Sequence, residues 1–355
     1  MNEAEGLVDA LGRPLRDLRV SVTDRCNFRC TYCMPREHFG RSHQFLPRAE
    51  LLSFEEIERL CRVFVGLGVK KIRITGGEPL LRRGLPQLVS MLSPLGVDLA
   101  LTTNGSLLAA LAGPLALAGL RRVTVSLDAL DDPTFAAMTD GRTRVEEVLA
   151  GIAAAEHAGL APLKVNAVVR KGVNEHSIVP LVRHFTGSGH AVRFIEYMDV
   201  GCSNSWDLRD IVPAREILRT IEEHFPLEPL EPAATGEVAR RYRRRDGGGE
   251  IGVISSVSSP FCNDCVRARL SSDGKLHTCL FSSSGTDLKT PLRLGSSDAE
   301  LAGIVASVWA AREDRYSELR SSRSRTNGGP TPSTPVQLAR PGQASRKIEM
   351  SYIGG

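Results

Sequence analysis

The sequence has 355 residues, of which 42% are hydrophobic and 24% are charged, with a formal net charge of +4. This length allows two domains, or one barrel with an appendage, and the composition allows a sizeable core. So small a net charge does not favour a nucleic-acid-binding protein, and no apolar run is long enough to cross a bilayer. The acidic N-terminus lacks a secretion signal. Eight cysteines do not make a disulfide scaffold in a chain this long, so we expect a reduced, cytoplasmic protein.

Short β-rich segments alternate with helical patterns between about residues 15 and 197. The predicted strands are Leu18–Thr23, Lys70–Thr75, Val97–Thr102, Arg121–Leu127, Pro162–Val169 and Ala191–Tyr197. After the first strand, Ser53 and Glu56 form a capping box that predicts a helix over Phe54–Gly66. Six βα units in series predict a parallel sheet, which could be an open barrel or a doubly wound fold.

One face of this predicted sheet is polar. Lys71 and Arg73 alternate with isoleucines in the second strand, and Lys164 and Arg193 alternate with apolar residues in the fifth and sixth. A parallel sheet covered on both faces should instead be almost continuously hydrophobic. An incomplete barrel with a polar ligand cavity explains the pattern, and a polyanion such as a triphosphate would neutralise the buried cations. The alternative for any single residue is a strand end in water.

Three cysteines, Cys26, Cys30 and Cys33, follow the first predicted strand with the spacing C-x3-C-x2-C. A four-iron cluster normally takes four thiolates, so three in one loop predict a cluster with one iron left open. The alternative is a structural zinc site, for which His38 or His43 is near enough in sequence to supply a fourth ligand.

The second predicted strand is followed by a glycine pair, Gly76-Gly77. Two glycines there allow the backbone to approach a ligand closely, at the C-terminal edge of the sheet. Elsewhere in the first part of the chain, Cys61 falls in the apolar pattern of a helix and is expected in the core.

The βα rhythm ends after Gly201. A Gly-Gly-Gly sequence near residue 248 predicts a β-hairpin, and Cys202 has no partner spacing. Residues 321–345 are rich in Ser, Pro, Gly and Arg, which predicts a flexible linker, and Lys347–Gly355 regains β character. We therefore expect a partial barrel over 1–200, a C-terminal domain over 201–320 that closes the barrel, a linker over 321–345 and a tail over 346–355.

A second cysteine triad lies in the predicted C-terminal domain. Cys262, Cys265 and Cys279 have the spacing C-x2-C-x13-C and again supply three thiolates, although His277 could complete a zinc site instead. Between them, Arg267 and Arg269 are two residues apart and so point to the same side of a strand. Guanidinium groups beside an open metal site suit a phosphate or an electron-rich base.

With both triads, the chain resembles the GTP 3′,8-cyclase family of the radical SAM superfamily, which acts in the first step of molybdenum-cofactor biosynthesis. The resemblance extends over nearly the whole chain. It is carried by Asp17–Cys26, Arg73–Pro79, Thr102–Gly105, Val125–Ala129, Lys164–Val168, Arg193–Met198, the second triad with its arginines, and the terminal Tyr352–Gly355. It implies an incomplete (β/α)6 radical SAM barrel with a C-terminal domain that carries a second iron–sulfur cluster.

The resemblance also implies roles for individual residues. The first triad would hold the cluster that cleaves S-adenosylmethionine, and the second triad would hold a four-iron cluster facing guanine. The cosubstrate would be contacted by Tyr32, Gly77, Ser126 and Met198. GTP would be held by Arg19, Arg73, Thr102, Lys164, Arg267, Ala268 and Arg269, with Lys71 and Arg193 nearby. The terminal Gly354 and Gly355 would reach the active site and help to trigger radical formation.

The implied activity is that of a lyase that converts GTP to (8S)-3′,8-cyclo-7,8-dihydroguanosine 5′-triphosphate. Its cofactors would be two 4Fe–4S clusters and S-adenosylmethionine, with an electron donor such as a flavodoxin. A homodimer is possible, and the product would pass to the cyclic pyranopterin monophosphate synthase. We expect neither a nucleic-acid nor a membrane partner. The competing hypotheses are a radical SAM enzyme that modifies peptides and a zinc-stabilised nucleic-acid-binding module.

Overall fold

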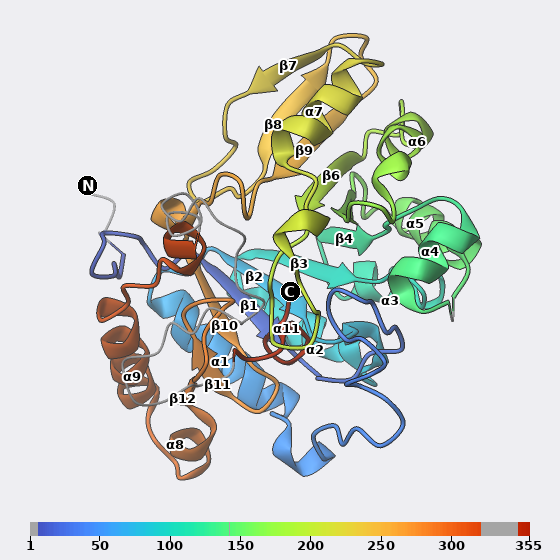
Figure 1. Cartoon of the computed structure of the whole chain (residues 1–355). Coiled ribbons are helices and arrows are strands. Elements are labelled where there is room, and N and C mark those ends of the chain that lie inside the picture. The colour runs from blue at the N-terminus through green and yellow to red at the C-terminus, as the bar shows by residue number, and fades with distance from the viewer. Residues whose placement is uncertain (1–5, 142, 321–346) are drawn as a thin grey trace.

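A single curved sheet organises the part of the chain that the computed structural model describes, residues 6–141, 143–320 and 347–355 (Figure 1). The sheet has twelve strands in the order β12-β11-β10-β1-β2-β3-β4-β5-β6-β9-β8-β7. The six central strands are parallel, and they are β1 (Asp17–Ser21), β2 (Lys71–Thr75), β3 (Asp98–Thr103), β4 (Arg122–Ser126), β5 (Lys164–Val169) and β6 (Ala191–Glu196). These are the six strands predicted from the sequence, so the α/β parallel fold is confirmed.

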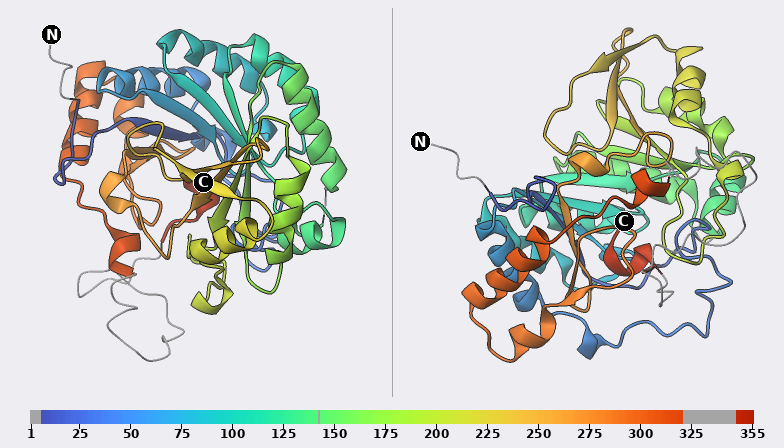
Figure 2. Two further views of the ribbon diagram at one scale, coloured as in Figure 1. Left: turned by 90° about the horizontal axis from the view of Figure 1, so that it is seen from above. Right: turned by 60° about the vertical axis from the view of Figure 1, so that its left-hand side comes forward.

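Helices connect the central strands and cover the outer face of the sheet (Figure 2, left). They are α1 (Phe54–Gly66), α2 (Leu85–Leu92), α3 (Leu108–Leu117), α4 (Asp132–Thr139), α5 (Val145–His157) and α6 (Ile178–His184). The predicted capping box opens α1, where the Ser53 hydroxyl accepts from the backbone N–H of Glu56 and the Glu56 carboxylate accepts from that of Ser53. No helix among the described residues is both long and apolar enough to cross a membrane.

The segment after Gly201 extends the sheet at both edges. At one edge, β10 (Arg267–Leu270) pairs parallel to β1, followed by the antiparallel β11 (Lys275–His277) and β12 (Thr286–Asp287). At the other edge, β9 (Glu250–Ile254) pairs parallel to β6, followed by the antiparallel β8 (Arg240–Arg244) and β7 (Leu227–Leu230). The predicted hairpin near residue 248 is therefore confirmed as β8–β9.

The remaining helices lie in this second part of the chain. They are α7 (Ala214–Glu222), α8 (Lys289–Arg293), α9 (Asp298–Ala310) and the short α11 (Met350–Ile353). One-turn 3-10 helices occur at Arg48–Glu50, Pro79–Leu81, Ser93–Leu95, Glu175–Ser177, Leu208–Asp210 and Cys262–Asp264. Helix α9 packs on α1, outside the sheet, whereas α11 packs on β1 and brings the C-terminus inside the curve of the sheet (Figure 2).

The alternation of side chains along the strands gives the sheet an apolar outer face and a polar inner face. Ile72 and Ile74 of β2 are fully buried beneath the helices, in one continuous core with Val165 of β5 and Cys61 of α1. Between the isoleucines, Arg73 points inward. The predicted polar face is thus the lining of an internal cavity, as expected for an incomplete barrel.

The prediction of β structure for the tail is wrong, because Met350–Ile353 forms the short helix α11. Of the β-branched and aromatic residues that suggested a strand, Ile353 is fully buried where α11 packs on β1, whereas Ile348 and Tyr352 line a second cavity. Ile348 donates its backbone N–H to the carbonyl of Ser282, and Tyr352 then donates to Glu349, which turns the chain into a helix. Tertiary packing here overrides β-propensity. The predicted linker over 321–345 lies outside the described residues.

Candidate active site

A cavity of about 660 Å³ lies within the curve of the sheet. Both cysteine triads line it, and so do nearly all the residues that the sequence predicted for the site. The predicted residues in its wall are Arg19, Cys26, Cys30, Tyr32, Cys33, Lys71, Arg73, Gly77, Thr102, Ser126, Lys164, Arg193, Met198, Cys262, Cys265, Arg267, Arg269, Cys279 and Gly355. The structure therefore brings together residues from the barrel strands, the C-terminal strands and the tail.

Two of the predicted site residues, Ala268 and Gly354, do not line the cavity. The side chain of Ala268 is fully buried in the core, because it alternates with Arg267 and Arg269 along β10 and faces the other way. Gly354 lies just behind the cavity wall, where its carbonyl accepts a hydrogen bond from the guanidinium of Arg269. A Cβ at this glycine would lie 1.9 Å from the hydroxyl of Thr75, and its φ of +77° also favours glycine.

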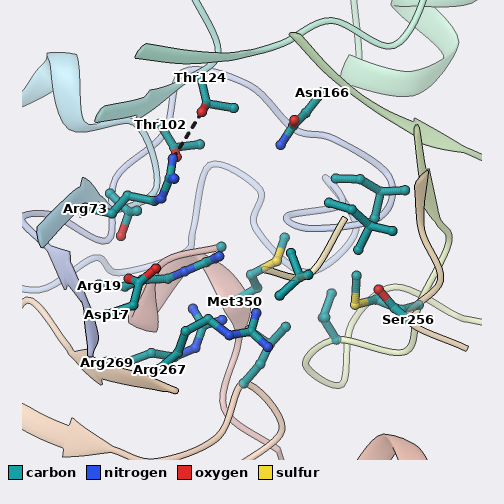
Figure 3. Close-up of a pocket in the computed structure, with 18 of the residues that line it drawn as sticks. Asp17, Arg19, Arg73, Thr102, Thr124, Asn166, Ser256, Arg267, Arg269 and Met350 are labelled. Carbon is teal, nitrogen blue, oxygen red and sulfur yellow. Dashed lines mark hydrogen bonds between the residues drawn. The ribbon is translucent and has the colours of Figure 1, made fainter. Parts of the chain in front are cut away.

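Strand register places the inner-face charges in two rows across the sheet (Figure 3). In the first row, Asp17 of β1 lies between Arg267 of β10 and Lys71 of β2. In the second row, Arg19 lies between Arg269 and Arg73, with no carboxylate among the three. Burial, together with the charges of Arg269 and Arg267, lowers the pKa of Arg19. The second row is therefore a concentration of positive charge that an anion would stabilise.

The buried guanidinium groups keep hydrogen-bonding capacity that the described residues do not use. The Nε atoms of Arg19, Arg73, Arg193 and Arg267 are buried without a hydrogen-bond partner. Buried polar atoms are normally paired, and an exception calls for an explanation such as a missing ligand. Each of these four residues lines the cavity, so a ligand with several acceptor oxygens would satisfy them.

Hydrogen bonds and charges also define the surroundings of Arg73, Lys164 and Arg193, which line the cavity on β2, β5 and β6. Arg73 donates from Nη1 to the hydroxyls of Thr102, at 3.0 Å, and Thr124, at 3.1 Å, and this holds its guanidinium in place (Figure 3). Lys164 of β5 forms no ion pair with any described residue, and burial together with Arg193 lowers its pKa to about 7. Arg193 pairs with Glu237, at 3.5 Å.

Chain topology places the two cysteine triads at opposite ends of the parallel strands. The first triad follows the C-terminal end of β1, at Ser21. Cys265 comes directly before the N-terminal end of β10, whose first residue, Arg267, pairs with Asp17 at the N-terminal end of β1. Because β1 and β10 are parallel, the rows of cations lie between the two triads.

The loop of the first triad surrounds its thiols with apolar and acidic groups. Burial, with a smaller contribution from Glu78, raises the pKa of Cys26 to about 12, and burial also raises the pKa of Cys30 and Cys33. The Sγ of Cys26 accepts from the backbone N–H of Phe28, at 3.4 Å, and more weakly from Asn104 Nδ2, at 3.9 Å, while Cys30 interacts with the side chain of Tyr32. Sparse hydrogen bonding of this kind lowers the reduction potential of an iron–sulfur cluster.

The glycine pair after β2 supports this loop. A Cβ on Gly77 would lie 2.4 Å from the carbonyl oxygen of Arg25, and one on Gly76 would lie 2.6 Å from that of Thr23. Gly77 also donates its N–H to the Thr23 carbonyl, at 2.8 Å. The close approach that the sequence predicted therefore brings the end of β2 onto the backbone of the cysteine loop, and Gly77 lines the cavity at that point.

Three polar residues beside the first triad were not predicted as site residues. Asp128 accepts from the Tyr32 hydroxyl, at 2.9 Å, and from the backbone N–H of Val168, and it thereby orients the tyrosine. Glu78 accepts from the backbone N–H of Asn104, at 2.7 Å, and burial raises its pKa to about 7. All three lie directly after strands, which is the signal that could have identified them.

The second triad has a markedly different, cationic environment. Arg267 donates to the Sγ of Cys265, at 3.3 Å, and although burial alone would raise the pKa of this thiol, the charges of Arg267 and Arg312 lower it to about 6. Arg312 and Arg13 also donate to the carbonyls of Cys265 and Cys262, and both guanidinium groups pair with the fully buried Asp9. This environment favours the thiolate of Cys265, the form that binds metal, whereas burial and the charge of Asp314 raise the pKa of Cys279 to about 12.

The donor geometry does not favour the zinc alternatives. Within the described ranges, no group of three His, Cys, Asp or Glu side chains converges as a single metal ion requires. A four-iron cluster needs a wider arrangement, because each thiolate binds a different iron. His277 is held by Ser282 and the Ser284 carbonyl and lies outside the cavity wall, and His43 packs between Phe39 and Phe45.

The comparisons with known proteins agree with this geometry. The Radical SAM superfamily model matches residues 20–185, and the model described as Molybdenum Cofactor Synthesis C matches residues 190–318. The fold is similar to that of SuiB of Streptococcus suis bound to S-adenosylmethionine, with a TM-score of 0.59 at 16% identity, over 87% of this chain and 68% of that one. The protein is therefore a radical SAM enzyme.

Sequence relatives identify the family more narrowly. A GTP 3′,8-cyclase of Acidothermus cellulolyticus is 54% identical over 98% of both chains. Another, of Staphylococcus haemolyticus, is 47% identical over 98% of both chains, and one of Xanthomonas campestris is 52% identical over 91% of this chain and 95% of the relative. The chain belongs to the GTP 3′,8-cyclase family.

Proposed function

We propose that the cavity between the two triads performs the GTP 3′,8-cyclase reaction of this family, with the triphosphate bound along the rows of cations. The observation that carries the proposal is the second row, in which Arg269, Arg19 and Arg73 lie on neighbouring strands with no carboxylate between them. A triphosphate has the charge and the acceptor oxygens that these guanidinium groups lack among the described residues. Lys164 would contribute a further positive charge once it is protonated.

Cys26, Cys30 and Cys33 would hold the first four-iron cluster, whose open iron would bind S-adenosylmethionine. Once bound and reduced, this pair supplies the 5′-deoxyadenosyl radical. Tyr32, Gly77, Ser126 and Met198 line the cavity beside the triad and would contact the cosubstrate. Asp128 orients Tyr32, and Glu78 fixes the turn at Asn104.

Cys262, Cys265 and Cys279 would hold the second four-iron cluster, which would supply an open iron for the guanine. The cationic surroundings of Cys265 support this assignment, because they stabilise its thiolate form. With the triphosphate on the cation rows, the nucleoside would lie between the two triads. In that position C3′ of the ribose would give up a hydrogen atom and bond to C8 of the guanine. One electron and one proton then complete the dihydroguanosine product.

In this reaction the side chains of the protein position the reactants and exclude water, and none is required as a nucleophile. The buried arginines hold the triphosphate, and Thr102 and Thr124 hold Arg73 in turn. The backbone of β10 beside Ala268 would complete the nucleotide wall, although its side chain does not face the cavity.

The reaction also indicates where the enzyme acts and with which partners. Single-electron reduction requires a donor, for which a flavodoxin-type protein is suitable, and the product is the substrate expected by the cyclic pyranopterin monophosphate synthase. We propose a cytoplasmic enzyme, a monomer or a homodimer, whose partial barrel spans residues 1–200 and whose auxiliary-cluster region spans 201–320. The family models matched at 20–185 and 190–318 support this division.

An anaerobic assay tests the proposed function. The reconstituted enzyme is incubated with GTP, S-adenosylmethionine and dithionite, and the products are separated by chromatography and identified by mass. We expect 5′-deoxyadenosine together with a cyclised nucleotide of the same mass as GTP, in equal amounts. ATP in place of GTP serves as the control. Formation of 5′-deoxyadenosine without any new nucleotide would contradict the proposal.

A further inference from the structure

The C-terminal tail forms a wall between two cavities. Met350, Ser351 and Gly355 line the active cavity described above. Ile348, Glu349, Ser351 and Tyr352 line a second cavity of about 520 Å³, which we call the outer cavity and whose other walls include Asp24, Phe39, His43, Phe45 and Lys275. Ser351 borders both. Displacement of the tail would therefore join the two cavities and admit water to the site.

The side chain of Glu349 attaches this wall to the loop that follows β6. Its Oε1 accepts from the backbone N–H of Cys202, at 3.0 Å, and from the Ser203 hydroxyl, at 2.6 Å. The carboxylate lies directly over Gly201, where a Cβ would be 2.0 Å from Oε2 and where φ is +65°. Glycine at this position permits the carboxylate to approach the loop backbone.

The same loop holds Lys347 through a buried carboxylate. Lys347 Nζ lies 3.0 Å from an Asp199 carboxylate oxygen and also donates to the Asp199 carbonyl. Asp199 is only 9% exposed, and it also pairs with Arg320 and accepts from the Tyr316 hydroxyl at 2.5 Å. Arg320 and Lys347 both pair with the Asp199 carboxylate. Removal of Lys347 alone would therefore leave this buried charge paired with Arg320.

The anchored segment ends beside the second row of cations in the active cavity. Six residues beyond Lys347, Ile353 is fully buried, and the carbonyl of Gly354 then accepts from Arg269, a member of the second row of cations. Met198, which lines the active cavity, belongs to the same loop and directly precedes Asp199. One loop therefore fixes both the tail and part of the proposed cosubstrate wall.

We infer that Glu349 and Lys347 are positioning residues that hold the terminal Gly-Gly against Arg269 and keep the active cavity closed from the outer cavity. This inference rests on the proposed function for its catalytic consequence, but the attachment itself can be measured without any reaction. Neither residue lines the cavity that would contain the substrates, although the charge of Glu349 acts on the thiol of Cys33 in the first triad.

Hydrogen–deuterium exchange of the full chain tests the attachment directly. In Glu349→Ala and Lys347→Met, we expect the backbone amides of residues 348–355 to exchange at least about tenfold faster, which corresponds to a loss of about 1.4 kcal/mol of closing free energy. Glu349→Gln should remain within about twofold of the parent, because a carboxamide oxygen can still accept both hydrogen bonds. Glu222→Ala, at an exposed glutamate of α7, is the matched control. Unchanged exchange of the α1 peptide shows that each variant is folded.

The second arm measures S-adenosylmethionine cleavage with and without GTP. We expect the GTP-dependent yield of 5′-deoxyadenosine to fall at least about tenfold in Glu349→Ala, while cleavage without GTP stays at the parent level. Unchanged exchange in Glu349→Ala would overturn the inference, and so would faster exchange with full GTP-dependent cleavage. If the parent itself formed no cyclised nucleotide, the proposed function would fail, while the exchange arm would still decide whether the anchor exists.

Discussion

Arg19, Arg73 and Arg269 come from three different strands, and the parallel register alone places them side by side. Alternation predicted that Arg73 would face the cavity, and the spacing of Arg269 placed it on the same side of a strand as Arg267, whereas Arg19 was expected at the site only from the family resemblance. What the sequence could not predict is their adjacency, since β10 is about 250 residues beyond β1. Asp128, Glu78 and Asn104 were missed for a related reason. Their position after strands was a signal, but their roles depend on hydrogen bonds to other segments of the chain, which that position alone does not reveal.

The second row of cations leads to a prediction for GTP affinity. Arg269→Ala should weaken GTP binding by about 1.5–3 kcal/mol, the range for a hydrogen bond to a charged group, and should leave S-adenosylmethionine binding nearly unchanged. Isothermal titration calorimetry measures both. Arg83→Ala, at an exposed arginine outside the cavity, is the control. An unaltered GTP affinity in Arg269→Ala would remove this residue from the site.

Lys164 leads to a prediction about the uptake of protons when GTP binds. Burial lowers its pKa to about 7 in the free enzyme, and a bound triphosphate would raise the pKa toward the ordinary lysine range. At pH 8, Lys164 is therefore mainly neutral before GTP binds and charged afterwards. Calorimetry at pH 8 in buffers of different ionisation enthalpy should show uptake of nearly one proton per GTP, and affinity should fall as the pH rises from 7 to 9.

Lys164→Met is the comparison for this measurement. It should bind GTP more weakly and lose most of the proton uptake, because no titrating amine remains. Equal uptake in the parent and in Lys164→Met would mean that another group takes up the proton.

At the scale of elements, the strands were predicted well and the tail was not. Strand positions followed from alternation and turn signals, and the ends of β1 to β6 fall within two residues of the predicted ones. The tail is short, and its conformation depends on the cavity wall that it enters, so its β-branched residues were misleading. The strand order at the two edges of the sheet was likewise not predictable, because it depends on pairings distant in sequence.

The C-terminal Gly354 and Gly355 lead to a prediction of their own. Deletion of Gly354 and Gly355 should leave iron content and GTP affinity nearly unchanged and should abolish most GTP-dependent formation of 5′-deoxyadenosine. The physical reason is that Gly354 occupies a position beside Thr75 and Arg269 that residues with a Cβ cannot take. The yield of 5′-deoxyadenosine is measured by chromatography. A truncated enzyme that cyclises GTP at the parent rate would show that the tail has no part in the reaction.

At the scale of the whole molecule, the C-terminal region completes the barrel at both edges rather than forming a separate body. Strand β10 brings its arginines and the second triad to β1, while β9 extends the sheet beyond β6. The first triad lies at the C-terminal ends of the parallel strands and the second at their N-terminal ends. This arrangement explains how two chemically different cysteine sites can serve one substrate between them.

The separate environments of the triads predict separate roles. The anaerobically reconstituted chain should hold roughly eight irons, four for each triad. Cys30→Ser should abolish S-adenosylmethionine cleavage, because that thiolate belongs to the low-potential site. Cys265→Ser should retain part of the cleavage and stop cyclisation. Iron analysis and product chromatography measure these effects, and equal loss of cleavage in both folded variants would argue against the division.

The most direct test of the account follows the hydrogen atom at C3′ of GTP. We propose that this atom lies within reach of the radical when the triphosphate occupies the cation rows between the two triads. GTP deuterated at C3′ is incubated anaerobically with the reconstituted enzyme, S-adenosylmethionine and reductant, and the 5′-deoxyadenosine is analysed by mass spectrometry. We predict 5′-deoxyadenosine that carries one deuterium, together with a cyclised nucleotide that has lost it. Unlabelled 5′-deoxyadenosine alongside a nucleotide that retains its deuterium would contradict the account.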